Sequence, residues 1–162
     1  MKKYEFTGEV KRIKLIGTEV VLRRIRAVTA FGVVEAGDIG GWIEKEENLS
    51  HDGSAWVHSS AWVYGDARVY GDAEVCGDAE VYSANHIFSI GPVGSRDGHT
   101  TFYRNKNKKI EVRCGCFNGR IEEFIEKVAE THGKNKHASV YRAAAEIAKL
   151  QIEPLSTDKE AE

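Results

Sequence analysis

The chain has 162 residues, of which 41% are hydrophobic and 30% charged, and its 23 basic and 25 acidic residues give a net charge of −2. This length fits one compact domain or two small ones, and this charge balance excludes intrinsic disorder as a description of the whole chain. No apolar run reaches the roughly 18–20 residues of a membrane span, and the first residues lack the apolar stretch of a signal peptide, so we expect a cytoplasmic protein that does not bind membranes.

Residues 1–53 are predicted to form a β-rich cap. Residues 9–15 and 19–28 have strand-like sequences, and residues 16–18 contain the glycine of a hairpin turn between them. Aliphatic residues then recur at six-residue offsets in two frames. They are Val33 and Ile39 in one frame, and Ile43 and Leu49 in the other. We interpret this segment as an irregular first coil that covers one end of the repeat that follows it.

Residues 54–89 form six consecutive hexads. They are SAWVHS, SAWVYG, DARVYG, DAEVCG, DAEVYS and ANHIFS. Alternation along a short strand turns the Ala and the Val of each hexad to one side, and a corner must follow before the next strand. The glycines at Gly65, Gly71 and Gly77 can relieve backbone strain at such corners. The 16 glycines and only 2 prolines of the chain agree with many tight corners.

This pattern resembles the left-handed parallel β-helix of hexapeptide-repeat proteins, in which three hexads make one triangular turn. The resemblance implies about two regular turns, with a β-meander of coincident spacing as the alternative. Residues eighteen apart should then stack. The predicted stacked pairs are Tyr64 with Tyr82, Tyr70 with Phe88, Trp56 with Glu74, and Trp62 with Glu80. Because hexapeptide-repeat proteins are usually trimers and so short a coil has an aromatic exterior, we expect a homotrimer or a higher homo-oligomer.

Charge is segregated along the chain. Residues 2–28 carry eight basic and three acidic side chains, whereas residues 51–83 carry six acidic and one basic side chain. Such a separation favours complementarity within or between subunits. The chain has no basic recognition helix, RNA-binding strand motif or zinc-finger spacing, so we expect no DNA or RNA partner.

Residues 90–152 are predicted to form a small α+β domain. Two strands form a hairpin, and two helices follow, the first with apolar residues at helical spacing. The predicted strands are 99–104 and 110–116, and the predicted helices are 121–132 and about 136–150. Residues 153–162 are predicted to form a flexible tail. The fold class is therefore mainly β, a short left-handed parallel β-helix with an irregular cap, followed by this α+β domain.

Several segments together resemble a group of phage- and prophage-encoded hexapeptide-repeat proteins. The segments are KYEFTGE, GDIGGWIE, SAWVYGDARVYGDAEV, GPVGSRDG with TTFY, CGCFNG, and the stretch from THG through HA to the next Tyr. Members of this group are mostly uncharacterised and often labelled as transferases or polymer-forming proteins. The resemblance implies a fold and a genomic source more than an activity.

The segment GPVGSRDG, residues 91–98, is the predicted ligand-binding loop. Glycine-rich turns can point successive main-chain N–H groups at an anion, and a serine hydroxyl and an arginine would add donors. Basic and aromatic residues follow, which suits a nucleotide-like ligand. The predicted ligand-binding residues are Gly94, Ser95, Arg96, His99, Thr100, Thr101, Tyr103, Arg113 and Phe117. The alternative is an ordinary linker and hairpin with a solvated, charged turn.

Cysteines give no metal or redox prediction. Cys114 and Cys116 lie near His132 and His137, but this spacing is not typical of a zinc site, and we predict two small residues buried under a helix. Cys76 replaces a tyrosine of the repeat and is predicted to lie on the exterior of the coil. We therefore predict neither a metal nor a cofactor.

Three functions remain open. The first is a non-catalytic, oligomeric phage protein that binds a small anionic, nucleotide-derived ligand, with sequestration of a host immune signal as the suggested counter-defence role. The second is a CoA-dependent hexapeptide-repeat acyltransferase, which needs a histidine base on the coil. The candidate bases are His51, His58 and His86. The third is a structural or host-protein-inhibiting module.

Overall fold

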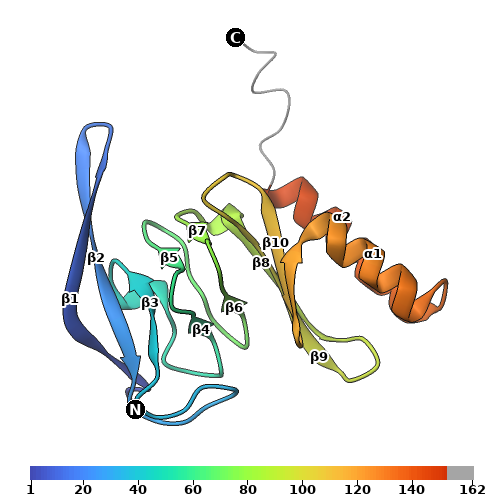
Figure 1. The fold of residues 1–162 in the computed structure, drawn as a ribbon, viewed down its shortest axis with the longest axis horizontal. Helices are drawn as coiled ribbons and strands as arrows, with labels where there is room; N and C mark the ends of the chain where they lie inside the picture. Colours follow the sequence, from blue (N-terminus) through green and yellow to red (C-terminus); the bar gives the residue numbers. More distant parts are fainter. Residues whose placement is uncertain (153–162) are drawn as a thin grey trace. The chain divides into compact units, whose positions relative to one another are not determined.

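The structure, a computed structural model, describes residues 1–152. The predicted flexible tail, residues 153–162, lies outside the described residues. The fold is mainly β, with two helices at the C-terminal end of the described part (Figure 1). The chain divides into two compact units, and the division falls between Ala84 and Asn85. We refer to them as unit 1 and unit 2.

Unit 1 consists of two sheets built mostly from short strands. Its elements are β1 (Tyr4–Leu15), β2 (Thr18–Ala27), β3 (Ile39–Ile43), the 3₁₀ helix η1 (Glu46–Asn48), β4 (Trp56–Val57), β5 (Trp62–Val63), β6 (Glu74–Val75) and β7 (Glu80–Val81). One sheet has the order β1-β2-β3-β5-β7, and the other pairs β4 with β6. The pairs β3–β5, β5–β7 and β4–β6 are parallel, as stacked turns of a coil require.

The regular part of the coil has the predicted period. Trp56 pairs with Glu74 and Trp62 pairs with Glu80, so one turn takes eighteen residues. The rings of Tyr64 and Tyr82 stack at 5.1 Å, which confirms another predicted pair. The alanines and valines of the first five hexads are at most 2% exposed. That these stacked strands form a left-handed parallel β-helix stays a prediction.

The corner glycines behave as predicted. Gly65, Gly71 and Gly77 have φ values of 60°, 63° and 57°, in the left-handed region that side chains rarely adopt. The next residue in each case is an exposed aspartate that opens the following hexad. The six-residue glycine period therefore marks the corners between successive hexads.

The first turn of the coil is longer than the others. Trp42 pairs with Trp62, and Leu49 bridges to Val69, so residues twenty apart are neighbours here. Ile43 and Leu49 are buried and keep the six-residue spacing, which places the two additional residues in the corner at 50–54. The frame of Val33 and Ile39 is wrong, because these side chains are 69% and 46% exposed.

The predicted hairpin is formed by β1 and β2, with its turn at Ile16–Gly17. It is a long, twisted ribbon at the N-terminal side of the coil (Figure 1). Val20 and Leu22 pack against Trp42 and Tyr64, and the ammonium group of Lys11 lies over the rings of Trp42 and Trp62 at 4.6 and 5.0 Å. The hairpin therefore covers the aromatic face of the coil.

Unit 2 is an antiparallel sheet with two helices. After the short helix η2 (Ala84–His86) its elements are β8 (Ile87–Val93), β9 (Gly98–Arg104), β10 (Ile110–Cys114), β11 (Phe117–Arg120), α1 (Ile121–His132) and α2 (Lys136–Ile152). The strand order is β11-β10-β9-β8. Phe102 and Val112 of the sheet share a core with Phe124 of α1 and Ala145 of α2. Both helices begin within a residue of the predicted positions.

The sixth hexad does not continue the coil. Ile87 and Phe88 belong to β8 and pair with Tyr103 and Phe102 in antiparallel register. The ring of Phe88 packs on Phe102 at 5.8 Å within unit 2, and its predicted stacking on Tyr70 stays a prediction. The pattern breaks where Asn85 replaces the small alanine that fills the inside of every earlier hexad. Strand β8 also extends through Pro92, in the segment predicted as a loop, since an edge strand tolerates proline.

Candidate functional site

His58 and Glu74 form a polar pair on the outer side of the coil. His58 follows β4, and Glu74 begins the neighbouring parallel strand β6. The imidazole Nε2 lies 2.9 Å from the carboxylate Oε1, and the two side chains are 28% and 22% exposed. When the ring is neutral, its Nε2–H donates to Glu74, and the lone pair is then on Nδ1. Glu74 therefore holds the imidazole of His58 in a defined orientation, with Nδ1 as its basic nitrogen.

The repeat explains how this pair arises. One hexad later, Tyr64 and Glu80 occupy the same two positions, and the Tyr64 hydroxyl donates to Glu80 Oε1 at 3.0 Å. The coil thus places a ring beside a glutamate of the next turn in two successive hexads. At His58 the ring is an imidazole, whereas at Tyr64 it is a phenol. His58 was predicted as a candidate base from the sequence, but the role of Glu74 was not. The Tyr64–Glu80 pair has the same sixteen-residue spacing as His58 and Glu74.

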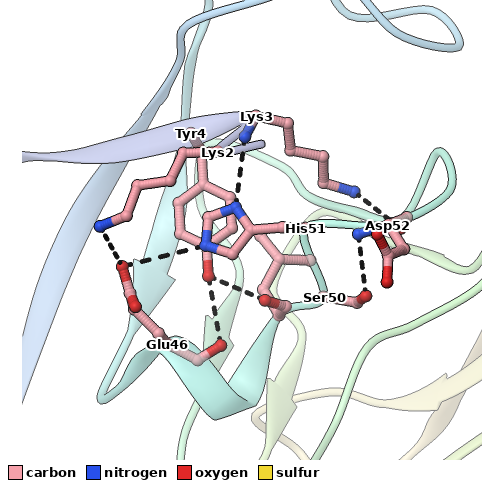
Figure 2. Close-up of polar contacts among 8 residues, drawn as sticks. Lys2, Lys3, Tyr4, Glu46, Ser50, His51 and Asp52 are labelled. Atoms are coloured by element: carbon pink, nitrogen blue, oxygen red, sulfur yellow. Dashed lines mark hydrogen bonds and ion pairs between the residues drawn. The ribbon is translucent and has the colours of Figure 1, made fainter.

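His51, the second candidate base, is part of the polar network at the enlarged corner (Figure 2). Its ring stacks on Tyr4 with centroids 4.1 Å apart. Its Nδ1 accepts a hydrogen bond from the main-chain N–H of Lys3 at 3.2 Å, and its Nε2 lies 3.9 Å from Glu46. Burial lowers the pKa of His51. Because its lone pair is used by the main chain, His51 anchors the N-terminal strand.

Lys3 closes the same corner. Its ammonium group donates to the carbonyl oxygens of Ala55, Gly53 and Asp52 at 2.7, 3.3 and 3.4 Å. It also lies 4.6 Å from the ring of Phe31, and the residue is only 5% exposed. Desolvation by burial lowers the pKa of Lys3 to about 8. The lysine supplies donors to carbonyl groups that the two additional corner residues leave outside the strand pairing.

Tyr4 ties the network to the far side of the first turn. Its hydroxyl donates to the carbonyl oxygen of Leu49 at 2.8 Å and lies 3.2 Å from that of Glu46. Burial raises the pKa of Tyr4, so the phenol stays protonated. The roles of Lys3 and Tyr4 were not predicted from the sequence. The available signal was the eight-residue interval between Leu49 and Val57, where the repeat requires six.

His86, the third candidate base, lies in unit 2. It is 8% exposed, and its Nε2 lies 3.0 Å from Nη1 of Arg104. Burial, and then the Arg104 charge, lower the pKa of His86 to about 4. Its imidazole is therefore a neutral acceptor for a guanidinium, and its lone pair is already used.

The predicted ligand-binding loop contains the turn between β8 and β9. Ser95 and Arg96 are exposed in this turn. Gly94 has a φ of 80°, and the hydroxyl of Tyr141 lies where its Cβ would be. The space beside this glycine is thus filled by a side chain of α2.

Strand alternation separates the remaining predicted ligand-binding residues into two rows. Thr100, Cys114 and Phe117 are register partners, and this row faces the helices, since Phe117 packs on Phe124 at 5.7 Å. Thr101 and Arg113 are partners in the other row. Tyr103 lies two residues beyond Thr101 in the same strand, and both are at most 2% exposed. The structure therefore brings Thr101, Tyr103 and Arg113 to one face and places Thr100 and Phe117 on the opposite face.

His99 is the remaining member of the predicted set. Gly91 approaches its ring so closely that a Cβ there would collide with Nδ1. Its Nε2 is buried, and no hydrogen-bond partner for this atom lies within residues 1–152. By alternation His99 lies on the face of Thr101 and Tyr103. A buried N–H or ring nitrogen of this kind normally has a hydrogen-bond partner, so His99 Nε2 can still take one.

The cysteines of unit 2 do not form a matched pair. Cys114 is half-buried, accepts a hydrogen bond from Thr100 Oγ1 at 3.2 Å, and donates to the Tyr141 hydroxyl at 3.9 Å. Cys116 is exposed in the turn before β11, so the prediction that both are buried was wrong for Cys116. Over the part of the chain that the structure describes, no three His, Cys, Asp or Glu side chains are grouped to hold a metal ion.

Comparisons with known proteins give one short similarity. No family model matches the chain. A stretch of 62 residues is 37% identical to the uncharacterized acetyltransferase YdcK of Escherichia coli strain K12. That stretch is 36% of this chain and 19% of YdcK, so the chain corresponds to less than a fifth of its relative. No helix within residues 1–152 combines the length and apolar composition of a membrane-spanning segment.

Proposed function

We propose that unit 1 catalyses acyl transfer, with His58 as the general base and Glu74 as the residue that orients it. The observation that carries this proposal is the 2.9 Å contact between His58 Nε2 and Glu74 Oε1 on the outside of the coil. A carboxylate on one ring nitrogen holds the imidazole, leaves the other nitrogen basic, and stabilises the imidazolium that forms when the base takes a proton. His51 and His86 lack this arrangement, since their ring nitrogens already accept hydrogen bonds from Lys3 and Arg104.

The similarity to YdcK supports the same reaction class, since that relative is named as an acetyltransferase. The donor is then an acyl thioester such as acetyl-CoA, and the acceptor carries an amine or a hydroxyl group. His58 removes the acceptor's proton as the acceptor attacks the thioester carbonyl. The proton then passes to the departing sulfur, so the products are the acylated acceptor and a free thiol.

The test is release of free thiol from acetyl-CoA by the full chain, measured over a panel of amine and hydroxyl acceptors. We expect His58→Ala to lower the rate by roughly 10²–10⁴-fold, the usual contribution of a general base. Tyr64→Phe is the matched control, because it removes the equivalent hydrogen bond to Glu80 one hexad later without removing a base. Equal rates in wild type and His58→Ala would overturn the assignment.

A second candidate function is anion binding by unit 2. The observation that favours it is His99, whose Nε2 is buried with no hydrogen-bond partner among the described residues, on the same sheet face as Thr101 and Tyr103. A small anionic ligand, a nucleotide among others, could accept from it. Sequestration of a host signal by a phage-encoded protein is the corresponding biological prediction.

A thermal-shift screen over cyclic and linear nucleotides tests this second candidate. A binding nucleotide should raise the melting temperature and be recovered intact after denaturation, and His99→Ala and Arg96→Ala should each reduce the shift. If both variants respond to the nucleotide as wild type does, the ligand lies elsewhere. Recovery of a cleaved nucleotide would indicate an enzyme instead.

A further inference from the structure

Cys76 occupies the same position in its turn of the coil as His58 does in the preceding turn. His58 follows β4 directly, and Cys76 follows β6 directly. These two strands are parallel neighbours, with Val57 opposite Val75. The main-chain N–H of His58 donates to the Val75 carbonyl at 2.9 Å, so the pairing continues to this position. The two residues are therefore adjacent in the stack.

The next hexad indicates how close side chains at this position come. Tyr64 and Tyr82 are the equivalent residues one hexad later, following β5 and β7, and their rings stack at 5.1 Å. The repeat thus brings side chains of this column into contact between successive turns. The same register places Cys76 next to His58 in this column.

Glu74 completes the group. It lies two residues before Cys76, so strand alternation puts both side chains on the outer side of the coil. The Glu74 carboxylate is bonded to His58 Nε2 at 2.9 Å, which leaves Nδ1 for the thiol. The three side chains have the order of a nucleophile, a base and an orienting carboxylate.

We propose that Cys76 is a nucleophile that carries the acyl group during transfer, a proposal that rests on the acyl-transfer function of unit 1. In the first step the thiol gives its proton to His58 and Sγ attacks the donor thioester. The new Sγ–C bond replaces the donor's C–S bond, and the donor sulfur leaves as a thiol with the proton from His58. In the second step the acceptor gives its proton to His58 and attacks the acyl carbon. The Sγ–C bond breaks, and Cys76 recovers the proton.

The surroundings of Cys76 suit a thioester intermediate. Only 7% of the residue is exposed, so an acyl group on Sγ is shielded from bulk water. Cys76 lies on the outer side of the coil, where it was predicted, and is buried there. Cys116, by contrast, is exposed in a turn of unit 2, and Cys114 contacts Thr100 and Tyr141. The chain therefore contains two internal comparisons for thiol reactivity.

The experiment treats the full chain with S-phenyl thioacetate, a small activated donor that needs no cofactor-binding surface, and maps the acetyl group by peptide mass spectrometry. We expect one acetyl group on Cys76, in wild type and in a Cys114→Ala, Cys116→Ala double variant. His58→Gln should slow this acetylation by about 10²-fold, whereas the matched variant Tyr64→Phe should leave it unchanged. Acetylation of Cys114 or Cys116 in preference, no acetylation of Cys76, or an equal rate in His58→Gln overturns the proposal.

A parallel assay with acetyl-CoA distinguishes the covalent Cys76 intermediate from the acyl-transfer function on which it rests. If wild type transfers acetyl groups and Cys76→Ala does so equally well, acyl transfer stands and the covalent intermediate is rejected. If Cys76 is acetylated by S-phenyl thioacetate in a His58-dependent way while acetyl-CoA is not consumed, the nucleophile stands and CoA-dependent transfer is rejected. Circular dichroism of each variant shows whether it is folded.

Discussion

At the scale of single residues, Lys3 is the side chain that fits the N-terminal strand to the coil. A hexapeptide coil normally satisfies its main-chain groups by stacking turns, but the enlarged corner at 50–54 has two residues more than the repeat. The ammonium group of Lys3 bonds to three carbonyl oxygens there, and Figure 2 shows the one from Asp52. The neighbouring Tyr4 bonds to the carbonyl oxygen of Leu49. Three neutral acceptors and one aromatic face replace the water that the cation loses on burial.

Removing the Lys3 ammonium should therefore be costly. In Lys3→Met the methylene stem remains, but the carbonyls of Asp52, Gly53 and Ala55 lose their donor, so we expect the free energy of unfolding to fall by about 1–3 kcal/mol. Lys2→Met is the matched control, because Lys2 is 71% exposed and forms a surface ion pair with Glu46. Loss of this ion pair should lower the free energy of unfolding by about 0–1 kcal/mol. Chemical denaturation of both variants measures this difference, and equal effects would show that the corner does not depend on Lys3.

His86 makes the stability of unit 2 depend on pH. Its pKa is lowered from 6.5 to about 4 in the folded chain, first by burial and then by the Arg104 charge. Between these two values the unfolded chain binds a proton that the folded chain does not, so the stability contributed above about pH 6.5 is lost as the pH falls toward 4. The helical circular dichroism signal, followed in denaturant at several pH values, should show this slope. His86→Gln should flatten the slope, because an amide oxygen can still accept from Arg104 but does not titrate. A slope unchanged in this variant would assign the dependence to other groups.

At the scale of elements, β3 determines how closely the first turn of the coil packs against the second. Its two central glycines lie against other parts of the coil. A Cβ on Gly40 would approach Trp56 and Ile25, and a Cβ on Gly41 would collide with the carbonyl oxygens of His58 and Ala61. These contacts place the main chain of β3 directly beneath the residue proposed as the base. The spacing of β3 therefore bears on the site as well as on the core.

Gly41→Ala should disturb both the proposed site and the packing of the core. The new methyl group has no space, because the nearest atoms are main-chain carbonyls that cannot rotate away. We expect a loss of about 1–3 kcal/mol in unfolding free energy, the usual cost of overpacking, and a reduced acyl-transfer rate because His58 must shift. Gly98→Ala is the control, since nothing lies within 4 Å of its Cβ position. It should stay within about 0.5 kcal/mol of wild type. A wild-type stability for Gly41→Ala would show that β3 can move away from the coil.

The elements also show which parts of the fold were predictable. The hexads predicted the eighteen-residue pairing, the buried alanines and valines and the corner glycines, because each depends on local alternation. The loss of the sixth hexad to β8 was not predicted, since Ile87 and Phe88 fit the repeat and only Asn85 departs from it. The pairing of β8 with β9 depends on contacts distant in sequence, and it overrode that local pattern.

The candidate site was predictable only in part. From the sequence, His58 was one of three equal candidate bases, with His51 and His86. The contact that distinguishes it is with Glu74, a residue of the next turn. The ligand-binding set of unit 2 was chosen as a continuous segment, and alternation along β9 and β10 then put Thr100 and Thr101 on opposite faces. Neighbours in sequence share a face only when their spacing matches the strand period.

At the scale of the whole molecule, charge and apolar surface are unevenly distributed. Residues 2–28 have a charge of +5, from eight basic and three acidic side chains, and residues 51–83 have a charge of −5, from six acidic and one basic. Tyr70 is 63% exposed on the acidic coil, and Ile16 is fully exposed at the tip of the basic hairpin. Opposite charges with exposed apolar groups at both places favour contact between the hairpin of one copy and the coil of another.

We therefore expect self-association that weakens with salt. Sedimentation velocity should show an oligomer at about 0.1 M salt and a shift toward the monomer at about 1 M, where the screening length falls from about 10 to 3 Å. Tyr70→Ser should weaken the oligomer at both salt concentrations, because it removes apolar contact area and leaves the charges unchanged. Thr29→Ser, a conservative change in the connection after β2, should leave it unchanged. An oligomer that is insensitive to salt and to Tyr70→Ser would place the interface elsewhere on the chain, and a monomer under all conditions would show that the charge segregation acts within one subunit.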